Sequence, residues 1–134
     1  MQLIDVSLRV GSETWLHPFS LTLAQHEINV LLGATRAGKT TLLRVLAGLD
    51  RPTTGRLLDG TRDVTGVHVR KRNVAMVYQQ FINYPSLTVF ENIASPLRIA
   101  GVGDAEMRAQ VGALAETLHL SALLGRYPAQ LSGG

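Results

Sequence analysis

The chain has 134 residues, of which 46% are hydrophobic and 17% charged, and its formal net charge is +3. This length and hydrophobic content are typical of one folded domain and exclude a disordered chain. The sequence has no cysteine, which excludes a disulfide framework and a thiolate metal site and fits a reducing compartment. Its apolar runs are too short for a transmembrane helix, and its first residues lack the continuous apolar run of a signal peptide.

The first third of the chain has the patterns of strands. Residues 3–10 and 19–24 alternate apolar and polar side chains, which predicts two half-buried strands that pair antiparallel through a connection from Gly11 to Pro18. Residues 28–33, INVLLG, form a continuous apolar run closed by glycine. Such a run predicts a strand that is buried on both faces.

Apolar residues recur at helical spacing directly after this run, so we expect a helix over residues 38–47 with Gly48 near its end. A turn-rich stretch follows, which predicts short strands around Asp59 and Gly60. Residues 73–79, NVAMVYQ, predict a second buried strand.

From Thr88 onward the pattern is helical. We expect one helix interrupted near Pro96 and a second helix that Asp104 caps. The only tight basic cluster is formed by residues 70–72, Arg-Lys-Arg. Because no aromatic residue interleaves with it, a solvated loop is favoured over a nucleic-acid patch.

The most informative stretch is GATRAGKTT, residues 33–41, which fits the pattern G-x-x-x-x-G-K-[ST] between a predicted strand and a predicted helix. The two glycines let backbone N–H groups converge on a phosphate, and the positive end of the helix dipole points to the same place. The nucleotide-binding residues predicted by this motif are Gly33, Ala34, Thr35, Arg36, Ala37, Gly38, Lys39, Thr40 and Thr41.

Three side chains of this loop have distinct expected roles. The Lys39 ammonium would reach the β- and γ-phosphates of ATP, and the Thr40 hydroxyl would bind Mg²⁺. The Thr41 hydroxyl would reach the α-phosphate. Lys39 is therefore a candidate catalytic residue as well as a nucleotide ligand.

Gln79 stands at the end of the second predicted strand. Ligands of parallel α/β sheets bind at the carboxyl ends of strands, so this amide would face the Mg²⁺ and the γ-phosphate. We expect Gln79 to bind the metal and to position a water, and an ordinary polar strand end is the alternative interpretation.

Together with LSGG at residues 131–134, these motifs resemble the ATPases of ABC transporters in order and spacing. LSGG resembles the signature motif of that family, and Gln79, followed at the family's interval by Pro85, resembles its Q-loop glutamine. The stretches 30–55 and 74–98 are similar to importer ATPases of the carbohydrate-uptake group, and within that group to the glycerol-uptake branch.

The resemblance implies an α/β P-loop NTPase fold that is incomplete in this chain. Residues 1–134 would form one partial domain, with a P-loop core and antiparallel β section at 1–86, a helical section at 87–128 and the start of the signature at 129–134. The family's cofactors are ATP and Mg²⁺.

The resemblance also implies partners. Two ATPase subunits, identical or different, would pair head to tail, with Ser132, Gly133 and Gly134 contacting ATP on the partner. The 80–92 region would contact transmembrane permease subunits at the cytoplasmic face of the inner membrane. The subunit would couple ATP hydrolysis to uptake of a small polar solute such as a sugar or polyol, and no nucleic acid is expected as a partner.

The sequence departs from the family pattern at several positions. Arg36 stands where these ATPases usually carry glycine. The aromatic residue that stacks on adenine should fall near Val10, and Trp15 lies five residues away. His26-Glu27 replaces a usual Gly-Glu turn. These departures bear on the affinity for ATP.

In the family, the aspartate, glutamate and histidine that complete hydrolysis follow LSGG. We therefore expect the chain to bind nucleotide without turning ATP over, and the apolar strands at 28–32 and 74–78 to be left uncovered. The alternative hypotheses are a non-catalytic nucleotide-binding remnant or regulatory module and a P-loop enzyme of another kind, such as a small kinase. LSGG and the register from Gln79 to Pro85 speak against the kinase.

Overall fold

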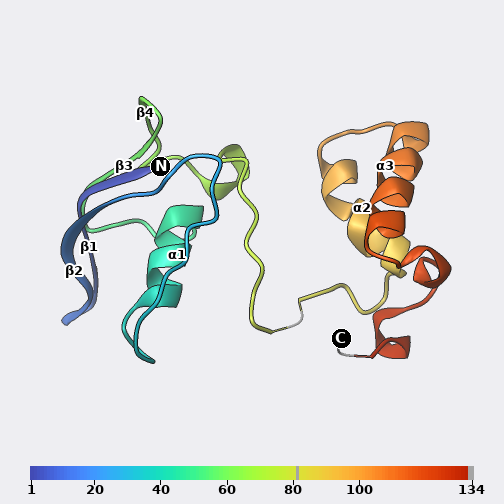
Figure 1. The fold of residues 1–134 in the computed structure, drawn as a ribbon, viewed down its shortest axis with the longest axis horizontal. Helices are drawn as coiled ribbons and strands as arrows, with labels where there is room; N and C mark the ends of the chain where they lie inside the picture. Colours follow the sequence, from blue (N-terminus) through green and yellow to red (C-terminus); the bar gives the residue numbers. More distant parts are fainter. Residues whose placement is uncertain (81, 133–134) are drawn as a thin grey trace. The chain divides into compact units, whose positions relative to one another are not determined.

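The computed structural model describes residues 1–80 and 82–132. The chain divides into two compact units, residues 1–77 and 78–134, and each is described by itself (Figure 1). The sections expected from the sequence, with boundaries after residues 86 and 128, stay a prediction.

The first unit is built on a four-stranded antiparallel sheet with the order β2-β1-β3-β4. Its strands are β1 (Gln2–Val10), β2 (Glu13–Thr22), β3 (Thr54–Asp59) and β4 (Arg62–Asp63). The antiparallel pairing of the first two strands is confirmed, but β2 begins six residues earlier than expected, so that only Gly11 and Ser12 connect the strands. Pro18 lies inside β2, where it is tolerated because β2 is an edge strand.

Helix α1 (Lys39–Ala47) covers one face of this sheet and ends at Gly48, as the sequence predicts. Leu42 and Val45 point into the core between helix and sheet, and Val45 has no exposed surface. The buried residues of this core are Leu3, Val6, Leu8, Leu16, Leu42, Val45, Leu57 and Val64.

Arg72 holds the carboxyl end of α1. Gly48 has φ +78°, and a Cβ there would collide with the guanidinium of Arg72. The guanidinium donates hydrogen bonds to the carbonyls of Val45, Leu46, Val64, Thr65 and Val67. It therefore supplies a donor to the Leu46 carbonyl and a second donor to that of Val45, which the Gly48 N–H also reaches, and it ties the helix end to the segment after β4. Burial lowers the pKa of Arg72, so the expectation of a solvated basic loop is wrong for this residue, whereas Arg70 and Lys71 are exposed.

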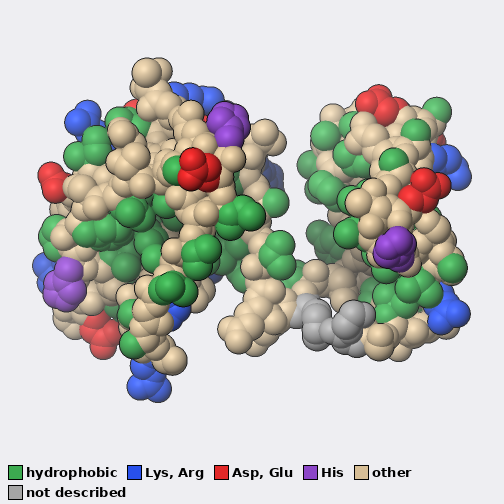
Figure 2. All heavy atoms as spheres, in the orientation of Figure 1, with side chains coloured by type: hydrophobic (Ala, Val, Ile, Leu, Met, Phe, Trp, Pro, Cys, Tyr) green, Lys and Arg blue, Asp and Glu red, His purple; other side chains and the backbone are tan. Residues whose placement is uncertain are grey.

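Residues 28–33 and 73–79 are not strands in the structure, which corrects two expectations. The side chains of Ile28, Leu32 and Val77 are 95%, 86% and 96% exposed. A strand needs hydrogen-bonded neighbours, and the described residues place none beside either run. Hydrophobic side chains are accordingly visible on the surface of the first unit (Figure 2). The expected uncovering of these apolar runs is what the structure shows.

The second unit contains α2 (Val89–Ile99), α3 (Asp104–Thr117) and two short 3₁₀ helices, η2 (Ser121–Leu123) and η3 (Pro128–Gln130). Helices α2 and α3 pack on each other through a core centred on Ala94, Met107 and Val111. The first unit holds one further 3₁₀ helix, η1 (Val69–Lys71). None of the helices in the described ranges is both long and apolar enough to traverse a bilayer.

Two expectations about the helix boundaries were wrong. Helix α2 continues through Pro96 without interruption. Proline removes the N–H that would bond the carbonyl of Asn92, and the Ser95 hydroxyl donates to that carbonyl instead, at 2.9 Å. Gly103 is the N-cap of α3, and Asp104 is its first helical residue, where its charge suits the helix dipole without capping it.

A capping box and an asparagine fix the entry into α2. The Thr88 side chain accepts from the Glu91 N–H at 3.2 Å, and the Glu91 carboxylate accepts from the Thr88 N–H at 2.8 Å. The Asn92 amide donates to the carbonyls of Tyr84, Leu87 and Thr88 and accepts from the Tyr84 N–H. The segment 84–88 is thereby bound to the first turn of the helix.

Substitution of Arg72 tests its role in the fold. We expect Arg72→Met to lower the free energy of unfolding of the first unit by about 2–3 kcal/mol, because it leaves part-buried carbonyls without a donor. Urea unfolding followed by the fluorescence of Trp15 measures this change. Arg70→Met removes an exposed arginine two residues away and should stay within about 0.5 kcal/mol of the parent. Equal effects of the two substitutions would contradict the assigned role.

The bidentate ion pair between Arg44 and Asp50, at 2.7 and 2.8 Å, predicts a pH dependence of stability. Hydrogen bonds from Arg44 hold the pKa of Asp50 below its ordinary value of 3.8. A carboxylate with a lowered folded-state pKa stabilises the fold above its unfolded pKa, and this contribution is lost as the pH falls through the folded pKa. Urea midpoints measured from about pH 5 downward should therefore fall less steeply in Asp50→Asn than in the parent. Asp59→Asn, at an exposed carboxylate at the end of β3, should leave the slope nearer that of the parent.

Candidate phosphate-binding site

The predicted phosphate loop lies directly before α1. The Ala37 N–H donates to the Ala34 carbonyl at 3.2 Å, which closes a tight turn. Arg36 and Gly38 have φ +67° and +84°, both in the left-handed region. The first N–H groups of α1 have no partner inside the helix, so the end of the loop is suited to bind an anion.

Lys39 is folded back over this loop. Its Nζ donates to the carbonyls of Gly33 and Ala34, at 2.7 Å each. The ammonium is thereby held at the loop whose N–H groups would receive a phosphate. A bound phosphate would compete for this ammonium with two neutral carbonyls, and a charged acceptor makes the stronger hydrogen bond.

The two glycines of the motif are not equivalent. At Gly38 a Cβ would lie 2.9 Å from Cδ2 of Leu16 and 3.3 Å from the carbonyl oxygen of Trp15, in addition to the positive φ. At Gly33 a Cβ would meet only ordinary contacts, at 3.6 Å or more, and no positive φ is required. Gly38 is therefore required by the approach of β2 to the start of α1.

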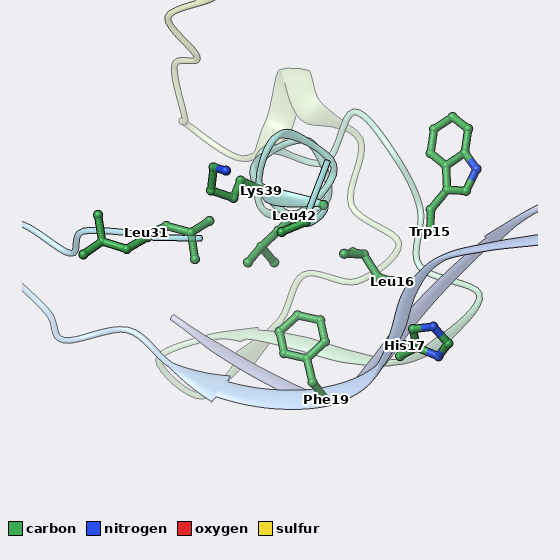
Figure 3. A pocket seen from close by; sticks show the side chains of 10 residues that line it. Trp15, Leu16, His17, Phe19, Leu31, Lys39 and Leu42 are labelled. Carbon is green, nitrogen blue, oxygen red and sulfur yellow. The ribbon is translucent and has the colours of Figure 1, made fainter. Parts of the chain in front are cut away.

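A hollow of about 330 Å³ lies between β2, the segment at 31–32 and the first turn of α1. In Figure 3, Lys39 and Leu42 project from α1, Leu31 lies beside them, and Leu16, His17 and Phe19 project from β2. The lining is largely apolar, with Lys39 and His17 as its titratable side chains. The hollow is therefore an apolar space beside the loop, whereas the groups suited to bind phosphate are the loop N–H groups and the Lys39 ammonium.

Trp15 stands beside this site. Trp15 as a residue is 48% exposed, and its Nε1 donates to the Glu13 carboxylate at 3.3 Å. Its backbone carbonyl packs against Gly38, and the residue lines the hollow. Val10, near which the sequence places the expected aromatic residue, is 46% exposed. The sequence shows that a tryptophan lies five residues from Val10. Only the structure shows that its backbone carbonyl lies close to Gly38.

The hydroxyls of the first turn of α1 are the remaining polar groups of the site. Thr40 is exposed, and among the described residues its side chain makes no hydrogen bond. Within residues 1–80 and 82–132, no three His, Asp or Glu side chains come together as a metal site. A Mg²⁺ at this loop would thus take oxygen ligands from a hydroxyl, from phosphates and from water.

The other predicted site residues lie in the second unit. Gln79 and Ser132 are both exposed. Gly133 and Gly134, predicted to contact ATP on a partner, lie outside the described residues, as does Phe81 in the 80–92 region. The structure thus brings together residues 33–41, and the roles of Gln79 and Ser132 stay predictions.

A loop with the pattern G-x-x-x-x-G-K-[ST] leads into α1, which packs on the sheet, and such a loop before a helix is typical of phosphate-binding domains. Comparison with known families makes this specific, because the ABC transporter family matches residues 16–134. The chain belongs to the ABC transporter family.

Curated relatives match along most of the chain. The sulfate/thiosulfate import ATP-binding protein CysA of Ralstonia nicotianae is 41% identical, over 100% of this chain and 37% of that protein. The spermidine/putrescine import ATP-binding protein PotA of Pseudomonas aeruginosa is 40% identical over 100% and 37%. The sn-glycerol-3-phosphate import ATP-binding protein UgpC of Yersinia pestis is 43% identical over 85% and 32%. The chain therefore spans about a third of the length of these relatives.

These identities confirm importer ATP-binding proteins as relatives. They do not single out the glycerol branch expected from the sequence, since import proteins for three different solutes are 40–43% identical to this chain. A solved structure also matches, the dimeric post-hydrolysis state of the ATP-binding cassette MJ0796 bound to ADP and Pi. Its TM-score is 0.82 at 26% identity, over 98% of this chain and 63% of that one. The expected ABC ATPase fold is confirmed.

The unequal environments of the two glycines predict unequal effects of alanine. We expect Gly38→Ala to lower the free energy of unfolding of the first unit by about 2 kcal/mol, from the left-handed backbone and the contact with Leu16. Gly33→Ala should stay within about 0.5 kcal/mol of the parent. Thermal or urea unfolding without nucleotide compares the two, and an equal loss of stability would contradict the difference assigned to the two glycines.

Proposed function

We propose that this chain is the ATP-binding part of an ABC importer subunit, in which residues 33–41 hold the triphosphate of ATP. The observation that carries the proposal is the placement of the Lys39 ammonium on the loop that opens onto the amino end of α1. An ammonium, converging N–H groups and the helix dipole together favour a multiply charged anion. Membership of the ABC transporter family supports a nucleotide as that anion.

The exposed indole of Trp15 provides a surface for the base. Trp15 lines the hollow beside the loop, and its backbone carbonyl lies close to Gly38. Aromatic side chains stack on nucleobases with little sequence preference. We infer that Trp15 takes the place of the aromatic residue that the family pattern puts near Val10.

Mg²⁺ and a second nucleotide contact complete the proposal. The exposed hydroxyl of Thr40 fits a Mg²⁺ ligand, and the Gln79 amide would bind the metal and orient a water. Ser132, Gly133 and Gly134 would contact ATP on a second ATPase subunit, and the dimeric ADP-bound relative supports such a pairing. The metal would neutralise phosphate charge, while the loop of this chain orients the phosphates.

The importer relatives support the remaining roles. The 80–92 region would contact a membrane permease at the cytoplasmic face, and ATP binding and hydrolysis would drive uptake of a small polar solute. The relatives are import proteins for sulfate, polyamines and sn-glycerol-3-phosphate. Within this function, residues 33–41 would bind ATP.

A second candidate function is nucleotide binding without hydrolysis. The phosphate loop and the Lys39 ammonium would serve such a binding or regulatory module equally well. A steady-state ATPase measurement separates the two functions, since turnover that Lys39→Ala abolishes would exclude the second.

Nucleotide binding can be measured through Trp15, the single tryptophan of the chain. We expect Mg-ATP to change its fluorescence and Lys39→Ala to weaken binding by about 10- to 100-fold, because a charge-assisted hydrogen bond to phosphate is lost. Lys71→Ala is the matched control, since it removes the only other lysine, which is exposed. Chelation of Mg²⁺ should weaken binding in the parent. Equal affinity of the Lys39→Ala and Lys71→Ala variants would overturn the proposed function.

A further inference from the structure

We propose that Arg36 binds the terminal phosphate of the bound triphosphate and makes the loop prefer ATP to ADP. This inference rests on the proposed function, because it assigns a role to a further residue of the same loop. The sequence pattern alone left open whether an arginine at this position binds phosphate or crowds the loop.

The first observation is the backbone of Arg36. Its φ of +67° lies in the left-handed region, which glycine adopts freely and side chains with a Cβ adopt at a cost. Glycine in this position would relieve that cost and leave the turn from Ala34 to Ala37 intact. A strained conformation that persists is a reason to look for a role of the side chain in binding.

The second observation is charge. Arg36 is exposed, and in the described ranges the ion pair found is that between Arg44 and Asp50, so no carboxylate neutralises the Arg36 guanidinium. Lys39, by contrast, has two carbonyl partners on the same loop. The loop therefore carries one cation that is held in place and one whose donors are available.

The chemistry of the two cations separates their roles. An ammonium acts on phosphate as a point charge, whereas a guanidinium donates two parallel hydrogen bonds to two oxygens of one phosphate. Arg36 lies within the turn, three residues before Lys39 and ahead of the helix end that receives the phosphates. We infer that its fork reaches the phosphate that ADP lacks, so its contribution falls on ATP.

The test compares the affinities for fluorescent ATP and ADP analogues in the unchanged 134-residue chain and in Arg36→Gly, Arg36→Lys and Arg70→Ala. We expect Arg36→Gly to lower the ratio of ATP to ADP affinity by about 10-fold, with ADP affinity changed less than about 2-fold. Arg36→Lys should fall between it and the parent, since it keeps the charge without the fork. Arg70→Ala removes an exposed arginine outside the loop and should keep the parental ratio.

Thermal unfolding separates this role from a structural one. Arg36→Gly should have a midpoint without nucleotide at or above that of the parent, because the left-handed residue becomes glycine. Arg36→Gly binding ATP as tightly as the parent, or more tightly, would show that the arginine only crowds the loop and would overturn the inference. If the unchanged chain bound nucleotide and Lys39→Ala abolished binding, the proposed function would survive that result. Absence of binding in the unchanged chain would overturn both.

Discussion

The packing of Leu42 and Val45 on the inner face of the four-stranded sheet is the interaction on which the first unit depends. It fixes α1 against β1 and β2, and the proposed phosphate loop lies at the amino end of that helix. Each fully buried aliphatic side chain contributes about 1.5–3 kcal/mol, so the burial of Leu42 and Val45 together exceeds the strain of about 1–2 kcal/mol at one left-handed residue. Arg72 adds a second attachment at the opposite end of the helix, through the carbonyls of Val45 and Leu46. The loop can therefore keep an unfavourable backbone conformation, because both ends of the helix behind it are held.

The sequence predicted the elements whose stability is local or whose partners are near in the chain. The alternation of β1, the helical spacing of α1 and the end of that helix at Gly48 all depend on neighbouring residues, and they were found as expected. The apolar runs at 28–33 and 73–79 predicted buried strands, because such composition normally reports burial on two faces. A strand is a property of a pair, however, and the described residues supply no pairing partner for either run. At Pro96 the sequence predicted an interruption that the structure does not have, because the Ser95 hydroxyl supplies the hydrogen bond that proline removes.

The candidate site was predictable in composition and only partly in geometry. The motif from Gly33 to Thr41 gave the residues of the loop, because the spacing of glycine, lysine and threonine is itself dictated by phosphate binding. It could not give the contact between Gly38 and Leu16, which depends on where an edge strand twenty residues earlier passes the helix. Nor could it show that Arg36 takes a left-handed conformation or that Lys39 rests on two carbonyls. These features arise from tertiary contacts and from the path of the backbone. Neither can be read from the identity of a single residue.

Asn92 gives the second unit a mechanical property. Its amide bonds both ends of the segment 84–88, while its own backbone belongs to the first turn of α2. The segment and the helix therefore form one stiff piece, and the capping box between Thr88 and Glu91 reinforces the joint. A displacement of this short segment by a partner would therefore not be taken up by bending of a loop. It would instead move α2, and with it the core that α2 shares with α3.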